Sequence, residues 1–225
     1  MPLDPQGRWP DRDPSHFWYQ FSRGCADFFV MDVRNERLLS EDEDERLMIS
    51  MYQEQALMAW LEQRPERIKC IVSPVVMFPD QRKLLRGSDA WEAFVAQRTR
   101  ILEAIRHGSA ERVLVLSGDV HAALATRLHT ARPDGRAMAI HNLVCSGLFW
   151  PSALMAFRWY EWALSTDDLL NTSGSAADYR VELMSDVYSR DAFARLDLSE
   201  EGFKFRVFTR RGEPVPEAGY SQAWM

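Results

Sequence analysis

Cysteine is scarce in this sequence: the 225 residues contain three, at Cys25, Cys70 and Cys145, and none of them forms a CxxC spacing. This excludes a disulfide framework and a zinc ribbon, and it favours a reducing compartment. An excess of positive charge is also missing, because 33 acidic and 27 basic residues are mixed along the chain and give a formal net charge of −6. We therefore expect no nucleic-acid-binding surface.

Several common signals are absent as well. The N-terminus has no basic start followed by an apolar core, so no secretion signal is visible and the chain as written is expected to be cytoplasmic. There is no glycine-rich phosphate loop of the GxxxxGK[ST] or GxGxxG kind. Cys145-Ser146-Gly147 offers nucleophiles, but no GxSxG elbow surrounds them and the nearest histidine, His141, has no identifiable acid to orient it, which argues against a serine hydrolase.

Apolar residues are abundant, at 46% of the chain, which is enough for a sizeable core. Helical periodicity predicts helices over residues 52–63 and 91–107, the second ending at Gly108. Four short apolar runs are predicted to be strands covered on both faces, namely residues 25–33, 68–77, 112–116 and 139–144. This order of elements indicates an α/β layered domain with a mostly parallel central sheet.

The two ends of the chain depart from this alternation. Residues 1–18 contain four prolines and are predicted to form an extended arm before a domain at 19–225. Residues 194–198 and 202–209 are separated by a short polar turn and are predicted to pair as a hairpin. The domain should therefore end in antiparallel strands.

One segment, residues 143–164, is very rich in large apolar side chains and contains three tryptophans. Its length suits a membrane span, but Pro151, Arg158 and Glu161 interrupt it. We therefore expect no membrane span, and the segment is interpreted as a buried helix or as a lid that contacts a partner.

The clearest candidate site is Ser117-Gly118-Asp119-Val120-His121, which directly follows the run 112–116. Ligands of open α/β sheets bind at the carboxyl ends of strands. Residues two apart in an extended segment point to the same side, so Asp119 and His121 can project into one cleft. A carboxylate and an imidazole suit iron, manganese or zinc. The same residues also allow a structural interpretation, in which Asp119 caps a helix over 122–128 and His121 lies in its first turn.

Two further groups of polar residues lie at the ends of predicted strands. His141 and Asn142 lie just before the apolar part of the run 139–144, where they either face the same cleft or form a polar pair entering a strand. Asp32-Val33-Arg34 ends the first strand. Its arginine is suited to a bidentate contact with a phosphate oxygen, or it forms an internal salt bridge.

Taken in order, several segments resemble the alkaline phosphatase D (PhoD-like) branch of the metallophosphoesterases. The resemblance runs from Phe17 to Ala123 and continues less clearly through 145–147 to the final strands. The segments that carry it are FWYQFSRGCADFFVMDVRNER, the helix at 54–61, IKCIVSPV, Asp89-Ala90-Trp91 with Arg98, and VLVLSGDVHAA.

This resemblance implies a metal-dependent phosphoesterase, acting on phosphomonoesters or phosphodiesters, with a layered α-β-β-α sandwich and a metal pair between its two sheets. The GDVH segment then belongs to the metal centre, with His121 as a ligand and Asp119 as a ligand or its support, and both residues are the candidate catalytic groups. His141 is a third candidate ligand, and Arg34 and Asn142 are candidate substrate contacts. The metal would be a divalent or trivalent ion, such as Fe, Mn, Zn or Ca.

The sequence also departs from this family. Its further metal ligands come from an upstream stretch with an early aspartate and an Asp-Asp-His-Glu-like segment, and residues 1–16 resemble neither. We therefore expect the chain to be the C-terminal part of the fold, as a fragment, as a separately encoded half whose partner chain supplies the missing ligands, or as a protein that has lost catalysis. The alternative function is a catalytically inactive interaction domain that uses residues 143–164 as its contact surface.

Overall fold

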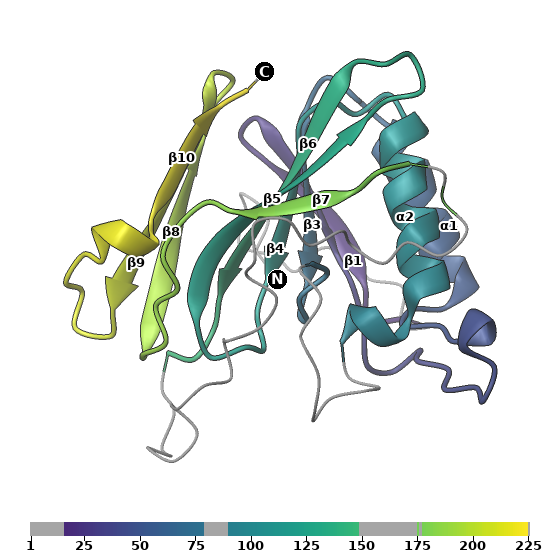
Figure 1. Ribbon diagram of the computed structural model, residues 1–225, viewed down its shortest axis with the longest axis horizontal. Helices are drawn as coiled ribbons and strands as arrows, with labels where there is room; N and C mark the ends of the chain where they lie inside the picture. The colour runs from purple at the N-terminus through teal and green to yellow at the C-terminus, as the bar shows by residue number, and fades with distance from the viewer. Residues whose placement is uncertain (1–15, 79–89, 149–174, 176, 225) are drawn as a thin grey trace, which may run out of the picture.

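The computed structural model describes residues 16–78, 90–148, 175 and 177–224 (Figure 1). Figure 1 shows a large sheet in the middle, two helices along one of its faces and a small sheet beside the other. The arm expected at 1–18 and the tryptophan-rich segment expected at 143–164 lie mostly outside the described residues. Within these ranges, no helix is long and apolar enough to cross a membrane.

The large sheet has seven strands in the order β1-β2-β3-β4-β6-β5-β7. Strands β2, β3, β4 and β6 run parallel to one another, whereas β1, β5 and β7 are antiparallel to their neighbours. The predicted mostly parallel sheet is therefore correct only for the centre. The strands are β1 (Tyr19–Arg23), β2 (Ala26–Val30), β3 (Ile68–Ser73), β4 (Val113–Ser117), β5 (Ala123–Ala131), β6 (Ala137–Cys145) and β7 (Arg180–Leu183).

Both predicted helices are confirmed, as α1 (Met51–Glu62) and α2 (Val95–His107). The first begins at Ser50, whose hydroxyl accepts a hydrogen bond from the Gln53 N–H at 3.1 Å. The second ends at Gly108, as expected, although the backbone there is extended rather than left-handed. The short 3₁₀ helices η1 (Glu43–Glu45) and η2 (Trp91–Ala93) precede these two helices.

The helices cover one face of the large sheet because their apolar stripes are buried there. Helix α1 contributes Leu57, Trp60 and Leu61 to the largest hydrophobic cluster of buried residues, and α2 contributes Ile101, Leu102 and Ile105. The sheet side of the same cluster includes Phe29, Ile71, Val115 and Ile140, from β2, β3, β4 and β6. Each of these strands thus buries the side chains of one of its faces under the helices.

The small sheet contains β8 (Ala192–Leu198), β9 (Gly202–Thr209) and β10 (Tyr220–Ala223), in the order β10-β9-β8, and η3 (Pro216–Ala218) precedes β10. The predicted hairpin is confirmed as β8 and β9, which pair antiparallel. Alternate residues of β9, Phe203, Phe205 and Val207, are buried in a second cluster with Cys70 and Leu114 of the large sheet. The two sheets therefore share a core.

The expected α-β-β-α sandwich is confirmed in part. The described residues form a helical layer, the seven-stranded sheet and the three-stranded sheet, in that order (Figure 1). A helical layer outside the small sheet is not found in this part of the chain.

Candidate active site

The parallel strands β2, β3, β4 and β6 all end at one edge of the large sheet, the edge formed by their carboxyl ends. Ser73 at the end of β3 lies opposite Ser117 at the end of β4, and Ser117 lies opposite Val144 near the end of β6. The segments that follow these strands, and residues 31–34 after β2, are therefore gathered at the same edge. This is the position at which open α/β sheets bind ligands.

The loop after β4 has a strained backbone. Asp119 has φ 65° and His121 has φ 54°, and the described residues contain one other non-glycine residue with positive φ, Arg64. Such a conformation costs about 1–3 kcal/mol per residue and persists where the surrounding structure enforces it. The structural interpretation of Asp119 as the cap of a helix over 122–128 is wrong, because residues 123–131 form strand β5.

Ser146 and Gly147, which follow β6, hold this loop. The Ser146 hydroxyl accepts hydrogen bonds from the backbone N–H groups of Val120 at 2.9 Å and His121 at 2.8 Å. Gly147 has φ 86°, and a Cβ atom added there would lie 3.3 Å from the His121 Cα. The sequence showed Ser146 only as an unsupported nucleophile, and its role as an acceptor depends on β4 and β6 being neighbours.

Arg34 reaches the same loop from the end of β2. Its Nη2 lies 3.5 Å from the Asp119 Oδ2, and the two side chains are 52% and 33% exposed. Asp32 shapes the turn that carries Arg34, because its Oδ1 accepts the backbone N–H groups of Arg34 and Asn35, both at 3.0 Å. The structure thus brings together Arg34, the loop of residues 119–121 and Ser146, which come from three segments that are distant in sequence.

Asn142 is fully buried beneath this edge. Its Oδ1 accepts a hydrogen bond from the Ser117 hydroxyl at 2.9 Å, and its Nδ2 donates to the Phe78 carbonyl at 2.5 Å. Both ends of the amide are therefore engaged with protein atoms. These bonds hold the end of β4 to Phe78, and the substrate contact expected of Asn142 stays a prediction.

His141, its neighbour on β6, points to the other face of the sheet, because successive side chains of a strand alternate. It lies opposite Leu114, three residues before the end of β4. Its ring contacts Phe203 at 5.0 Å between centroids, and its Nδ1 lies 3.4 Å from the Tyr220 hydroxyl. The structure does not bring His141 together with His121, so it does not support the expectation that both bind one metal.

The described residues do not complete a metal site. Within ranges 16–78, 90–148 and 177–224, no group of three or more His, Cys, Asp or Glu side chains is arranged to hold a metal ion. Asp119 and His121 offer one oxygen and one nitrogen donor, which suit iron, manganese or zinc. Two donors are fewer than the three or four protein ligands of typical catalytic and structural zinc sites.

Comparisons with known proteins agree with this architecture. The family model of the PhoD-like phosphatases matches residues 1–154. A solved structure of PhoD superposes with a TM-score of 0.59 at 18% sequence identity, over 99% of this chain and 43% of that one, and this similarity establishes the fold. The chain thus spans less than half of the length of that structure. A search of curated proteins gives no match. Since the family model covers more than half of the sequence, the chain belongs to the PhoD-like phosphatase family.

Proposed function

We propose that this chain supplies the Arg34, Asp119 and His121 side of a metal-dependent site that hydrolyses phosphate esters. The observation that supports this most strongly is the left-handed backbone of both Asp119 and His121, held by Ser146 at the edge where four parallel strands end. Backbone strain of this kind gathers at functional sites, because a relaxed loop would not present the same side chains.

The metal would be held by His121 and Asp119 on this side of the site. When bound, such an ion activates water and neutralises charge on the phosphoryl group. The remaining ligands would come from residues outside the described ranges or from a partner chain, since two donors do not complete the coordination shell. Iron, manganese, zinc and calcium are the candidate ions.

Arg34 would bind the substrate. Its guanidinium group is half exposed and already faces the edge of the site, where it can donate two parallel hydrogen bonds to non-bridging phosphate oxygens. The ion pair with Asp119 is solvent-accessible, and pairs of this kind contribute about 0–1 kcal/mol. Exchanging this carboxylate partner of Arg34 for a phosphate oxygen therefore costs little.

The test is hydrolysis of a chromogenic phosphomonoester and a chromogenic phosphodiester, with metal content measured by elemental analysis. The purified chain is assayed alone and mixed with the separately expressed upstream part of a PhoD-like protein. We expect bound metal and turnover in at least one of these samples. His121→Ala and Asp119→Asn should each lower turnover by about 100-fold or more, because loss of a residue that merely orients a metal ligand already costs about 10–100-fold. Arg34→Gln should mainly raise KM.

A matched control is His107→Ala, at the exposed end of α2, which should leave turnover unchanged. The proposal fails if no sample binds metal and hydrolyses either ester, or if His121→Ala behaves like His107→Ala. If the chain is instead an interaction domain that acts through residues 143–164, its function should depend on Trp150 and Trp162 and not on His121.

A further inference from the structure

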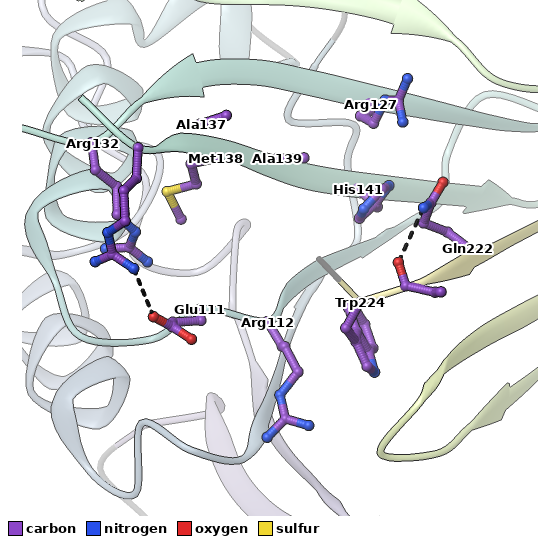
Figure 2. A pocket seen from close by; sticks show the side chains of 12 residues that line it. Glu111, Arg112, Arg127, Arg132, Ala137, Met138, Ala139, His141, Gln222 and Trp224 are labelled. Carbon is purple, nitrogen blue, oxygen red and sulfur yellow. Dashed lines mark hydrogen bonds and ion pairs between the residues drawn. The ribbon is translucent and has the colours of Figure 1, made fainter. Parts of the chain in front are cut away.

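A pocket of about 230 Å³ lies at the opposite end of β4 from the candidate active site (Figure 2). Its walls come from the residues just before β4, from the β5–β6 hairpin and from β10 with the residue that follows it. Strand β4 is five residues long, so about 15 Å separate its two ends. The lining residues are Glu111, Arg112, Arg127, Arg132, Arg136, Ala137, Met138, Ala139, His141, Gln222, Ala223 and Trp224.

The lining is strongly positive although the chain as a whole is negative. Four arginines face the pocket against a single carboxylate, that of Glu111, whereas the whole sequence carries a formal charge of −6. Two of the arginines have acidic partners. Arg127 pairs with Glu182 at 2.7 Å, and Arg136 pairs with Asp134 at 2.7 Å and with Glu111 at 3.1 Å.

The other two arginines, Arg112 and Arg132, form no close ion pair within the described part of the chain. Arg132 is 9% exposed and donates to the backbone carbonyls of Gly108 at 2.5 Å and Ala110 at 2.6 Å. Arg112 donates to the carbonyls of Glu66 and Glu200. A carbonyl satisfies a hydrogen bond without neutralising a unit charge. The charge of Arg132 also acts over a longer distance on the Asp134 carboxylate, whose pKa it helps to lower.

Beside Arg127, the wall of the pocket also supplies neutral polar and aromatic groups, from His141, Gln222 and Trp224 (Figure 2). Burial, with a smaller contribution from the positive charges of Arg127 and His129, lowers the pKa of His141 from 6.5 to about 4. His141 is therefore neutral at pH 7, and its ring does not add a charge that would need a further partner. The Trp224 ring is fixed by a hydrogen bond from its Nε1 to the Ser199 carbonyl at 2.9 Å.

We propose that this pocket binds a small polyvalent oxyanion of the phosphate class, with Arg112 and Arg132 as its principal charged contacts. The volume is below the 300–1,000 Å³ typical of sites for drug-sized molecules, which favours inorganic phosphate or pyrophosphate. A dianion would give both guanidinium groups the close ionic partner that they lack among the described residues. None of the lining residues belongs to the proposed active site, so the inference does not rest on the proposed hydrolysis.

The test is calorimetric titration of the purified chain with inorganic phosphate and, separately, pyrophosphate. Metal is first removed with a chelating resin, so that ions held through a metal do not contribute. We expect saturable binding at one site. Arg112→Gln should raise Kd about tenfold, which corresponds to about 1.4 kcal/mol, because it removes a charged hydrogen-bond donor from the site. Glu111→Gln should lower Kd about threefold, because it removes the one carboxylate of the lining.

Arg195→Gln is the matched control, since Arg195 is an exposed arginine on β8 that pairs with Asp197. It changes the net charge as Arg112→Gln does and should leave Kd unchanged. Circular dichroism confirms that each variant is folded, and Glu111→Gln tests the site independently if Arg112→Gln unfolds. The inference is overturned if wild type shows no saturable binding, if Arg112→Gln and Glu111→Gln both bind like wild type, or if Arg34→Gln is the variant that abolishes binding.

Discussion

The backbone N–H of His121 donates a hydrogen bond of 2.8 Å to the hydroxyl of Ser146, 25 residues later in the chain. This contact joins the loop after β4 to the residue after β6, and it exists because these two strands are parallel neighbours that end in register. The backbone that carries the His121 side chain is therefore held by a serine from a distant segment.

Ser146→Ala should destabilise the protein by about 1–3 kcal/mol, because it leaves the N–H groups of Val120 and His121 without their acceptor. Urea unfolding measures this change in the free energy of unfolding. Ser221→Ala, at an exposed position of β10, is the control and should have little effect. Equal stabilities of the two variants would show that Ser146 does not hold the loop.

Gly147→Ala and Gly135→Ala form a matched pair. Both glycines have nearly the same left-handed backbone, with φ 86° and 85°, so each substitution should cost about 1–2 kcal/mol in backbone strain. A Cβ at Gly147 also meets the His121 Cα at 3.3 Å, whereas a Cβ at Gly135 meets no atom within 4 Å. We expect backbone strain to lower the free energy of unfolding by the same amount in both variants. Only Gly147→Ala should also lose metal binding or turnover. A loss of activity in Gly135→Ala would contradict this account.

Asn142→Leu should destabilise the protein by about 2–3 kcal/mol, because it keeps the shape of the side chain but leaves the Ser117 hydroxyl and the Phe78 carbonyl without partners. Thr126, which lies opposite Asn142 on β5, is equally buried, and its hydroxyl has no hydrogen-bond partner among the described residues. Thr126→Val should therefore be neutral or stabilising. Thermal unfolding of the two variants compares them directly, and a large loss for Thr126→Val would be inconsistent with this assignment.

Glu103 should make stability depend on acid pH. Burial raises its pKa, but hydrogen bonds from Arg106, Tyr179 and Ser175 outweigh that effect and lower the pKa from 4.5 to about 2. Between these two pKa values the unfolded chain binds more protons than the folded one. The stabilisation that the ionised Glu103 gives the folded protein is therefore complete above about pH 5 and is lost as the pH falls toward 2. Glu103→Gln should remove about 1–2 kcal/mol of stability at pH 7, after allowance for partial solvent screening, and progressively less at pH 4 and pH 3.

Urea unfolding at pH 7, 4 and 3 checks this pH dependence, with the exposed Glu217→Gln as the control. A difference between wild type and Glu103→Gln that is the same at every pH would show that the loss comes from packing and not from the ionised carboxylate.

The elements that were predictable from the sequence are those whose signal is local. Helix α1 was predictable because Leu57, Trp60 and Leu61 recur at helical spacing, and β3 and β4 because they are nearly continuous apolar runs. Strands β1, β5, β7 and β10 were missed, because short or partly polar strands gain their stability from pairing with distant segments. The GDVH segment was found for the same local reason: it follows directly on a recognisable strand.

By itself, the sequence determined the α/β class, the hairpin at the end and the family, because local periodicity and a run of ordered motifs carry that information. Only the tertiary structure decided that Asn142 lies beneath the candidate site while its neighbour His141 faces the small sheet, since strand register sets which face each side chain occupies. It likewise decided that Arg34 meets Asp119, because parallel strands bring the ends of distant segments to one edge.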